Sequence, residues 1–169
     1  MEIYYTLTED DYMNFNLYHV RNSSTAKKAL KMQRLMGPFL YLFFTILVYL
    51  YLDIPLPVLV IMFLALSSLW FFLYPRYFYN HILRSTKKMI KEGTNDGLLG
   101  EHHMIVSDEG ITDFSTNRET KVQWSGIQLF KEDDENLYLY NSSVSAYILP
   151  KRDLKKTDVV RDYILSKIS

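Results

Sequence analysis

The chain of 169 residues contains no cysteine and only six glycines. The lack of cysteine excludes disulfides, thiolate metal sites and a cysteine nucleophile. Few loops can bring a glycine backbone close to a phosphate, and neither a Gly-rich phosphate loop nor a Gly-x-Ser-x-Gly nucleophile elbow occurs. We therefore predict a protein that is not an enzyme and that needs no cofactor and no metal.

Charge is absent from two neighbouring stretches, residues 35–52 and 54–74, which only Asp53 separates. An α-helix rises about 1.5 Å per residue, so each stretch is long enough to cross a bilayer core of about 30 Å. We therefore predict a transmembrane helical hairpin at residues 35–75. Two core helices of a soluble protein are the alternative, but so small a domain could not cover two helices that are apolar all round.

The charges that flank the two stretches indicate their orientation. Ten Lys and Arg residues lie at the outer ends, within residues 21–35 and 76–92, and none lies in the turn at residues 53–57. Positive residues beside short spans stay on the cytoplasmic side, so we expect a two-span protein of the cell membrane with both termini cytoplasmic. The spans carry no ionisable residue, which favours an anchor over a transport path. Small residues at 65, 67 and 68 suit a close helix contact, within the hairpin or across a homodimer.

The remaining residues predict an α+β membrane protein in which a small antiparallel β-barrel accompanies the hairpin. We expect an N-terminal strand and cytoplasmic helix in residues 1–34, a juxtamembrane helix and hinge in 76–97, and a cytoplasmic β domain with a C-terminal helix in 98–169. Turn residues punctuate the tail regularly, which is typical of a meander that closes or half-closes into a barrel. The seven predicted strands are 2–7, 101–107, 111–115, 119–124, 127–132, 137–141 and 146–149.

The first of these strands stands far from the others in the sequence. An unpaired apolar strand is a site of aggregation, so we expect residues 2–7 to pair with the tail. The hairpin would then be inserted within the β domain. A helix that begins near Asp153 or Thr157 and reaches Ile168 would plug one mouth of the barrel.

Three parts of the sequence together resemble one family. They are the opening IYYTLTEDDYMNFNLYH, the membrane hairpin, and the tail pattern EGI…W…I…LYLY…YILPKRDL. This combination resembles the YcxB-like family of small bacterial membrane proteins, with its tail signature at Gly110, Trp124, Ile127, Leu139 and residues 148–152. The resemblance implies an integral membrane location and a pleckstrin-homology-like (PH-like) C-terminal domain. It implies no catalytic residues.

Two groups of residues are candidates for a role. The first group comprises bases suited to anionic lipid headgroups, each worth about 1 kcal/mol near a membrane surface. The second is the core of the β domain, in which one buried tryptophan would anchor the middle. The bases are Lys27, Lys28, Lys31, Arg34, Arg84, Lys87, Lys88, Lys91, Lys151 and Arg152, and the core residues are Trp124, Ile127, Leu139 and Ile148.

His102 and His103 form the one adjacent histidine pair. On a strand their side chains point to opposite faces, so they cannot bind one metal together without other ligands such as Glu101 or Asp113. Packed or solvent-facing histidines are therefore the preferred interpretation. The acidic loop at residues 133–135 lacks the alternating ligands and the central glycine of a calcium loop, which favours a solvated hairpin tip.

Taken together, the sequence predicts a non-enzymatic membrane protein that presents its β domain at the inner membrane face. Its expected partners are membrane lipids and a protein or peptide. Nucleic acid is not expected, because residues 98–169 contain 12 Asp and Glu against 9 Lys and Arg. A protective role, as in bacteriocin immunity or envelope stress, is an alternative by analogy of fold alone. A metal-dependent regulator that uses His102 and His103 is a further alternative.

Overall fold

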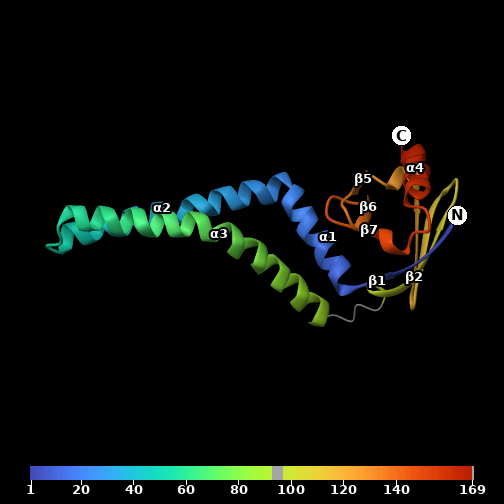
Figure 1. Cartoon of the computed structure of the whole chain (residues 1–169), viewed down its shortest axis with the longest axis horizontal. Helices are drawn as coiled ribbons and strands as arrows, with labels where there is room; N and C mark the ends of the chain where they lie inside the picture. The colour runs from blue at the N-terminus through green and yellow to red at the C-terminus, as the bar shows by residue number, and fades with distance from the viewer. Residues whose placement is uncertain (93–96, 169) are drawn as a thin grey trace. The chain divides into compact units, whose positions relative to one another are not determined.

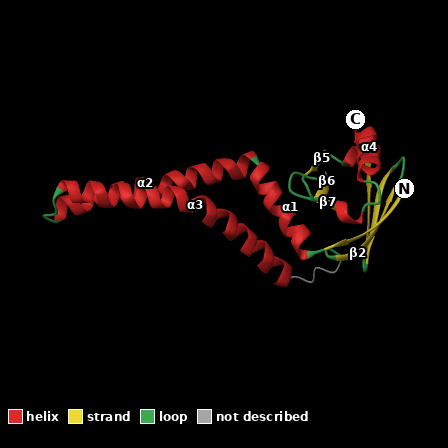
Figure 2. Ribbon diagram, in the orientation of Figure 1, coloured by secondary structure: helices red, strands yellow, loops and turns green. Residues whose placement is uncertain are grey.

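The computed structural model describes residues 1–92 and 97–168 (Figures 1 and 2). Most of the hinge predicted at the end of residues 76–97 therefore lies outside the described residues. The chain divides into two compact units, one of Met1–His19 with Thr86–Ser169 and the other of Val20–Ser85. The second unit is thus inserted, in sequence, within the first.

Four strands of the first unit form an antiparallel sheet in chain order: β1 (Glu2–Leu7), β2 (Gly100–Val106), β3 (Gly110–Ser115) and β4 (Arg118–Gln123). β1 pairs with β2 along its whole length, so the predicted pairing of the N-terminal strand with the tail is confirmed. Alternate residues of β1 are buried, as the two-residue period of a half-covered strand requires.

The other three strands form a second antiparallel sheet: β5 (Leu129–Glu132), β6 (Asn136–Tyr140) and β7 (Ala146–Pro150). The described residues thus contain seven strands, which is the predicted number, but the two sheets are not closed into one barrel. The 3₁₀ turn η1 (Trp124–Gly126) interrupts the chain between the sheets. On the open edge of β1, Thr6 bonds to the side chains of Asp153 and Arg152, so no backbone ladder forms at this position.

The hydrophobic core of the first unit combines residues of both sheets with one face of each of two helices. α4 (Thr157–Ile168) contributes Val160 and Ile164, and it begins at one of the two predicted positions. α1 (Glu9–Asn22) places Phe15 against the rings of Tyr138 and Tyr140. Each of these residues follows the apolar spacing of an amphipathic helix or a buried strand.

A reciprocal cap fixes the start of α1. The Thr8 hydroxyl accepts from the Asp11 amide at 3.2 Å, and the Asp11 carboxylate accepts from the Thr8 amide at 2.8 Å. This pair of bonds satisfies donors that the first helical turn leaves without partners. Acidic residues at positions 9–11 also suit the positive end of the helix dipole.

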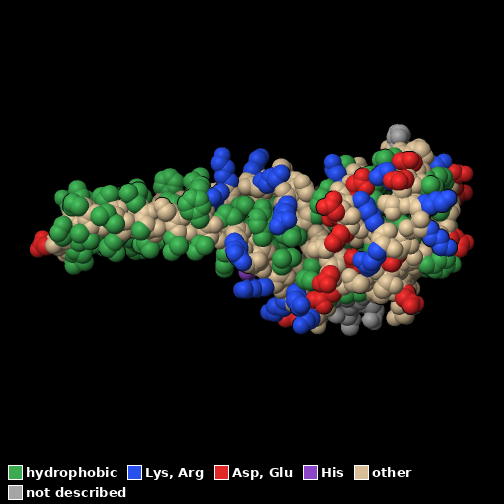
Figure 3. Space-filling model, viewed as in Figure 1, with side chains coloured by type: hydrophobic (Ala, Val, Ile, Leu, Met, Phe, Trp, Pro, Cys, Tyr) green, Lys and Arg blue, Asp and Glu red, His purple; other side chains and the backbone are tan. Residues whose placement is uncertain are grey.

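The second unit is a pair of long helices, α2 (Ser24–Tyr51) and α3 (Leu56–Glu92). Both are long and apolar enough to span a membrane, and only 6% of either apolar window is buried. That exposure argues against core helices of a soluble protein, which would be mostly covered. α3 continues through Pro75, as predicted for the juxtamembrane segment. Hydrophobic side chains cover the hairpin, and Lys and Arg side chains gather where this hydrophobic surface ends (Figure 3).

Several contacts join α2 to α3 near the basic end of the hairpin. Gly37 lies against Trp70, since a Cβ on Gly37 would come within 2.3 Å of Trp70 Nε1. The Tyr74 hydroxyl donates to Gln33 at 2.7 Å. Arg34 Nε donates to the Phe71 carbonyl at 2.7 Å. Pro75 has no N–H for that carbonyl, four residues earlier, so Arg34 satisfies an acceptor that the helix itself cannot.

The three small residues expected to form a close helix contact differ in their burial. The Ser67 hydroxyl is buried, whereas Ala65 and Ser68 are exposed. The contact between helices instead uses Gly37, which carries no side chain and admits the large ring of Trp70.

Candidate functional site

The structure separates the predicted lipid-contacting bases into two classes. Arg34 is engaged with Phe71, and Lys151 and Arg152 are engaged inside the first unit, so these three are not free for headgroups. The remaining seven have exposed side chains: Lys27, Lys28, Lys31, Arg84, Lys87, Lys88 and Lys91. Two of these also form exposed ion pairs, Lys87 with Glu9 at 3.4 Å and Lys88 with Glu92 at 3.5 Å.

Three of the four predicted core residues are in the core. Ile127, Leu139 and Ile148 are each at least 95% buried. Trp124 was expected in the middle of the core, but it lies half-buried at the edge, in η1. Its indole Nε1 donates to the Ser107 carbonyl at 3.0 Å. A tryptophan whose N–H needs a partner is more easily accommodated at the edge of a core than at its centre.

Arg152 links β1, α1 and the segment before α4. Its two terminal nitrogens donate to the two oxygens of Asp11 at 2.6 and 2.7 Å, and one of them also donates to the Thr6 carbonyl at 2.9 Å. Burial alone would raise the pKa of Asp11, but the hydrogen bonds from Arg152 and Thr8 outweigh it and lower that pKa below its usual value. Asp11 is therefore an ionised carboxylate inside the domain.

The free edge of β1 offers unpaired backbone groups. Met1 and Val106 exchange two hydrogen bonds, of 2.6 and 2.8 Å, which fixes the phase of the β1–β2 ladder. Bonded pairs alternate along an antiparallel ladder, so Glu2, Tyr4 and Thr6 direct their N–H and C=O groups away from β2. Asp153 and Arg152 satisfy Thr6, and they leave Glu2 and Tyr4 open.

A groove of about 450 Å³ runs beside this open edge. β1 forms one wall, and the start of α4 with the residues before it forms the other. The groove is mainly apolar: Leu154 and Val160 line it, and Val159 is 53% exposed there. Exposed Lys155 and Lys156 stand on the same wall.

The two adjacent histidines lie on opposite faces of β2, as their spacing predicts. His103 is stacked between Tyr4 and Phe114, and its Nε2 lies 3.3 Å from Glu2. His102 is 7% exposed and its Nδ1 lies 3.0 Å from Asp113. Across residues 1–92 and 97–168, no group of three or more His, Asp or Glu side chains is placed to hold a metal ion.

Asp113 is the centre of a buried polar network that the sequence did not reveal. Its carboxylate accepts from the Tyr5 hydroxyl at 3.0 Å and from His102 on its other oxygen. Burial, reinforced by the Asp113 charge, raises the pKa of Tyr5 far above its usual value, so the phenol stays protonated and donates. The available signal was a polar residue at an inward position of an alternating strand, since Ile111 and Asp113 share one face of β3.

Residues 106–161 match the family model described as YcxB-like protein. The matched segment runs from the last residue of β2 into α4. It confirms the resemblance found in the sequence, and the chain carries a YcxB-like domain over these residues. Neither the curated proteins nor the solved structures include a match to the chain.

Proposed function

We propose that the protein is a membrane-anchored, non-catalytic docking module whose two spans hold a PH-like domain at the inner membrane face with both termini in the cytoplasm. The two helices of sufficient length and the ten-to-zero bias of flanking bases support this topology. A four-stranded meander, a three-stranded meander and a C-terminal helix support the PH-like assignment.

The partner is an extended, acidic segment of another protein, bound as an additional strand on β1. The open backbone groups of Glu2 and Tyr4 beside the groove carry this proposal. An exposed strand edge binds an extended peptide through main-chain hydrogen bonds, while neighbouring pockets select alternate side chains.

The charged side chains that line the groove determine whether an acidic or a basic peptide should bind. Two acids line the groove: Asp153 lies 3.9 Å from Arg152, and Glu2 lies 3.3 Å from the His103 ring. Lys155 and Lys156 keep their charges for a ligand. Acidic side chains on one face of the peptide would meet them, and apolar side chains on the other would enter the groove.

The test is a selection from a random peptide library against the full chain in phosphatidylcholine nanodiscs. We expect selected peptides to alternate apolar residues with Asp or Glu and to slow hydrogen exchange at residues 2–4. Tyr4→Pro removes an N–H that faces the groove and leaves the β2 ladder intact, so it should weaken peptide binding at least tenfold.

Two results would contradict this assignment. One is peptides that bind the Tyr4→Pro variant as tightly as the parent protein. The other is a selected set without acidic residues. In either case the open edge of β1 is not the docking site.

Anionic lipid is a second proposed partner, and the seven exposed bases that flank the spans favour it. Each base near an anionic surface contributes about 1 kcal/mol, and the effect is screened by salt. Neutralising Lys27, Lys28 and Lys31 to Gln should reduce the enrichment of phosphatidylglycerol around the protein in mixed nanodiscs. Unchanged enrichment at low salt would refute it.

A further inference from the structure

We infer that a polar cavity between the two sheets binds a small molecule that carries an oxyanion at one end and hydroxyl or amino groups on the rest of the molecule. The cavity measures about 160 Å³ and is lined by residues of β1 to β4 and β7 and by the β6–β7 loop. It lies entirely within the first unit. The groove beside β1 is a different surface, so this site does not depend on the proposed docking function.

Two buried atoms that line the cavity lack hydrogen-bond partners. Nε2 of His102 is one, and Oδ1 of Asn141 is the other. The Asp113 carboxylate can only accept, so Nδ1 of His102 carries a proton, and Nε2 is the ring nitrogen left without a partner. An unsatisfied buried polar atom loses the hydrogen bonds that water would give it. Nε2 of His102 therefore calls for a polar partner at the far end of a ligand, and Oδ1 of Asn141 calls for a donor on the side of Arg118, beside the oxyanion. Hydroxyl or amino groups of a ligand would provide both.

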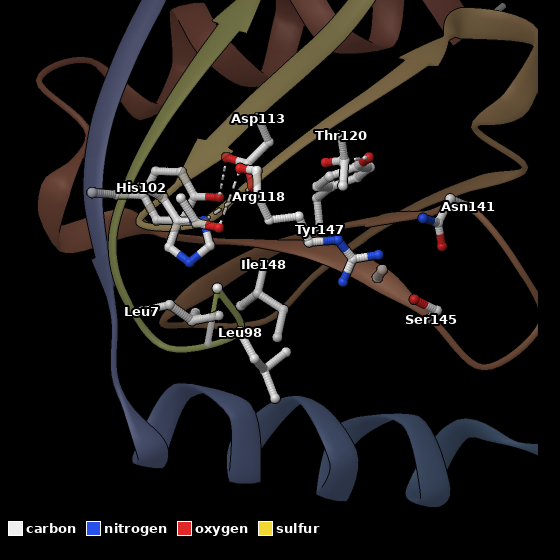
Figure 4. A pocket seen from close by; sticks show the side chains of 14 residues that line it. Leu7, Leu98, His102, Asp113, Arg118, Thr120, Asn141, Ser145, Tyr147 and Ile148 are labelled. Atoms are coloured by element: carbon white, nitrogen blue, oxygen red, sulfur yellow. Dashed lines mark hydrogen bonds and ion pairs between the residues drawn. The ribbon is translucent and has the colours of Figure 1, made fainter. Parts of the chain in front are cut away.

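The charged end of the ligand is selected by Arg118. This residue is exposed, and Figure 4 shows its guanidinium directed toward Asn141 and Ser145, on the side of the cavity opposite His102. A guanidinium presents five donors in a planar fork that matches a phosphate or carboxylate. The Ser145 and Tyr147 side chains line the same side and add hydroxyl groups.

The size of the cavity limits the ligand. An apolar cavity of about 150 Å³ accommodates benzene, whereas drug-sized ligands occupy about 300–1,000 Å³. The space between the sheets therefore fits a molecule of a few carbon atoms, with its oxyanion at the open rim beside Arg118. Gly97 closes part of the wall, because a Cβ there would come within 2.6 Å of Ser115 Oγ.

The test is titration calorimetry of the full chain in phosphatidylcholine nanodiscs with three probes: inorganic phosphate, glycerol and sn-glycerol 3-phosphate. We expect glycerol 3-phosphate to bind at least tenfold more tightly than phosphate, and glycerol not to bind. Arg118→Gln should weaken glycerol 3-phosphate at least tenfold. The control is Lys121→Gln, which removes the same charge from the opposite face of β4 and should change affinity less than twofold.

A second variant tests the hydroxyl group of the ligand that lies beside the oxyanion. Asn141→Ala should lower the affinity for glycerol 3-phosphate toward that for phosphate and leave phosphate binding unchanged. Equal loss for both probes would overturn the assignment of Asn141. Absence of glycerol 3-phosphate binding to the parent protein, or equal binding to Arg118→Gln, would overturn the site.

The phosphoglycerol group also occurs in a lipid headgroup, and a second arm separates the two sources. The same titration is repeated in nanodiscs that contain phosphatidylglycerol. Weaker apparent binding of glycerol 3-phosphate there indicates competition by the headgroup. Unchanged binding indicates a soluble ligand, and both results support the chemistry of the site.

Discussion

Removing Arg152 should destabilise the first unit more than its position near the surface suggests. Asp11 is only 3% exposed, and Arg152 supplies two of its four hydrogen bonds. Removing one partner of a fully buried ion pair costs about 3–5 kcal/mol. The Arg152 side chain is 48% exposed, so water screens the interaction and reduces that figure. We therefore expect Arg152→Met to cost about 2 kcal/mol, part of it from the lost bond to Thr6.

The assay is urea unfolding of the full chain in detergent micelles, followed by near-ultraviolet circular dichroism of the tyrosines. With a slope of about 1–3 kcal/mol/M, a loss of about 2 kcal/mol lowers the midpoint by roughly 0.7–2 M. Lys121→Met is the matched control, because its ion pair with Glu109 is exposed and should contribute less than about 0.5 kcal/mol.

A double-mutant comparison identifies the cause of the loss. In an Asp11→Asn background no buried charge remains beside Arg152, so Arg152→Met should cost less than half as much as it does in the parent protein. An equal cost in both backgrounds would show that the charge pair is not the source. A cost below about 0.5 kcal/mol in the parent protein would refute the reasoning entirely.

Three further predictions concern pH and two glycines. The pKa of Asp11 is lower in the folded chain than its usual 3.8, so its contribution to stability is complete above that value and is lost as the pH falls through the folded pKa; urea midpoints between pH 2 and 7 test this, and a flat profile contradicts it. Gly37→Leu should separate the helices of the hairpin, because a Cβ would lie 2.3 Å from Trp70 Nε1; a lower melting temperature in micelles is expected, and an unchanged one would refute the contact. Gly110→Ala places a Cβ 2.1 Å from the Val122 carbonyl oxygen and should cost about 1–3 kcal/mol in urea unfolding, more than an exposed substitution.

Strands and spans could be predicted because each depends on a local pattern. Glu2–Leu7 alternates buried and exposed positions, and its predicted bounds match β1. The predicted spans have no charge over lengths sufficient to cross a bilayer core, and the structure places both on helices of that kind. The closure of the sheets depends instead on which groups meet at an edge. At Thr6 two side chains bond to the backbone groups that a neighbouring strand would otherwise pair with. No periodicity in the sequence indicates these bonds.

The candidate sites were less accessible to sequence reasoning, because they join residues far apart in the chain. Arg152 was assigned to the membrane surface from its charge alone, yet its partner Asp11 lies 141 positions away. The adjacent histidines suggest metal binding as one alternative, whereas in the structure the contact with Asp113 makes His102 part of a buried network. The polar cavity depends on Asn141 and Arg118, neither of which is unusual in its local sequence.

The inserted hairpin explains how so distant a strand can complete the sheet. Glu2 pairs with Ile105 across more than 100 residues, and a flexible connection of that length would carry a closure cost that grows with the logarithm of its length. Here most of the connection is the two helices α2 and α3, which contact each other through Gly37 and Trp70. Because paired antiparallel helices return the chain to the end at which it left, the hairpin shortens the effective loop. Formation of the hairpin and completion of the β1–β2 ladder are therefore expected to stabilise each other, even though the two elements share no sequence pattern.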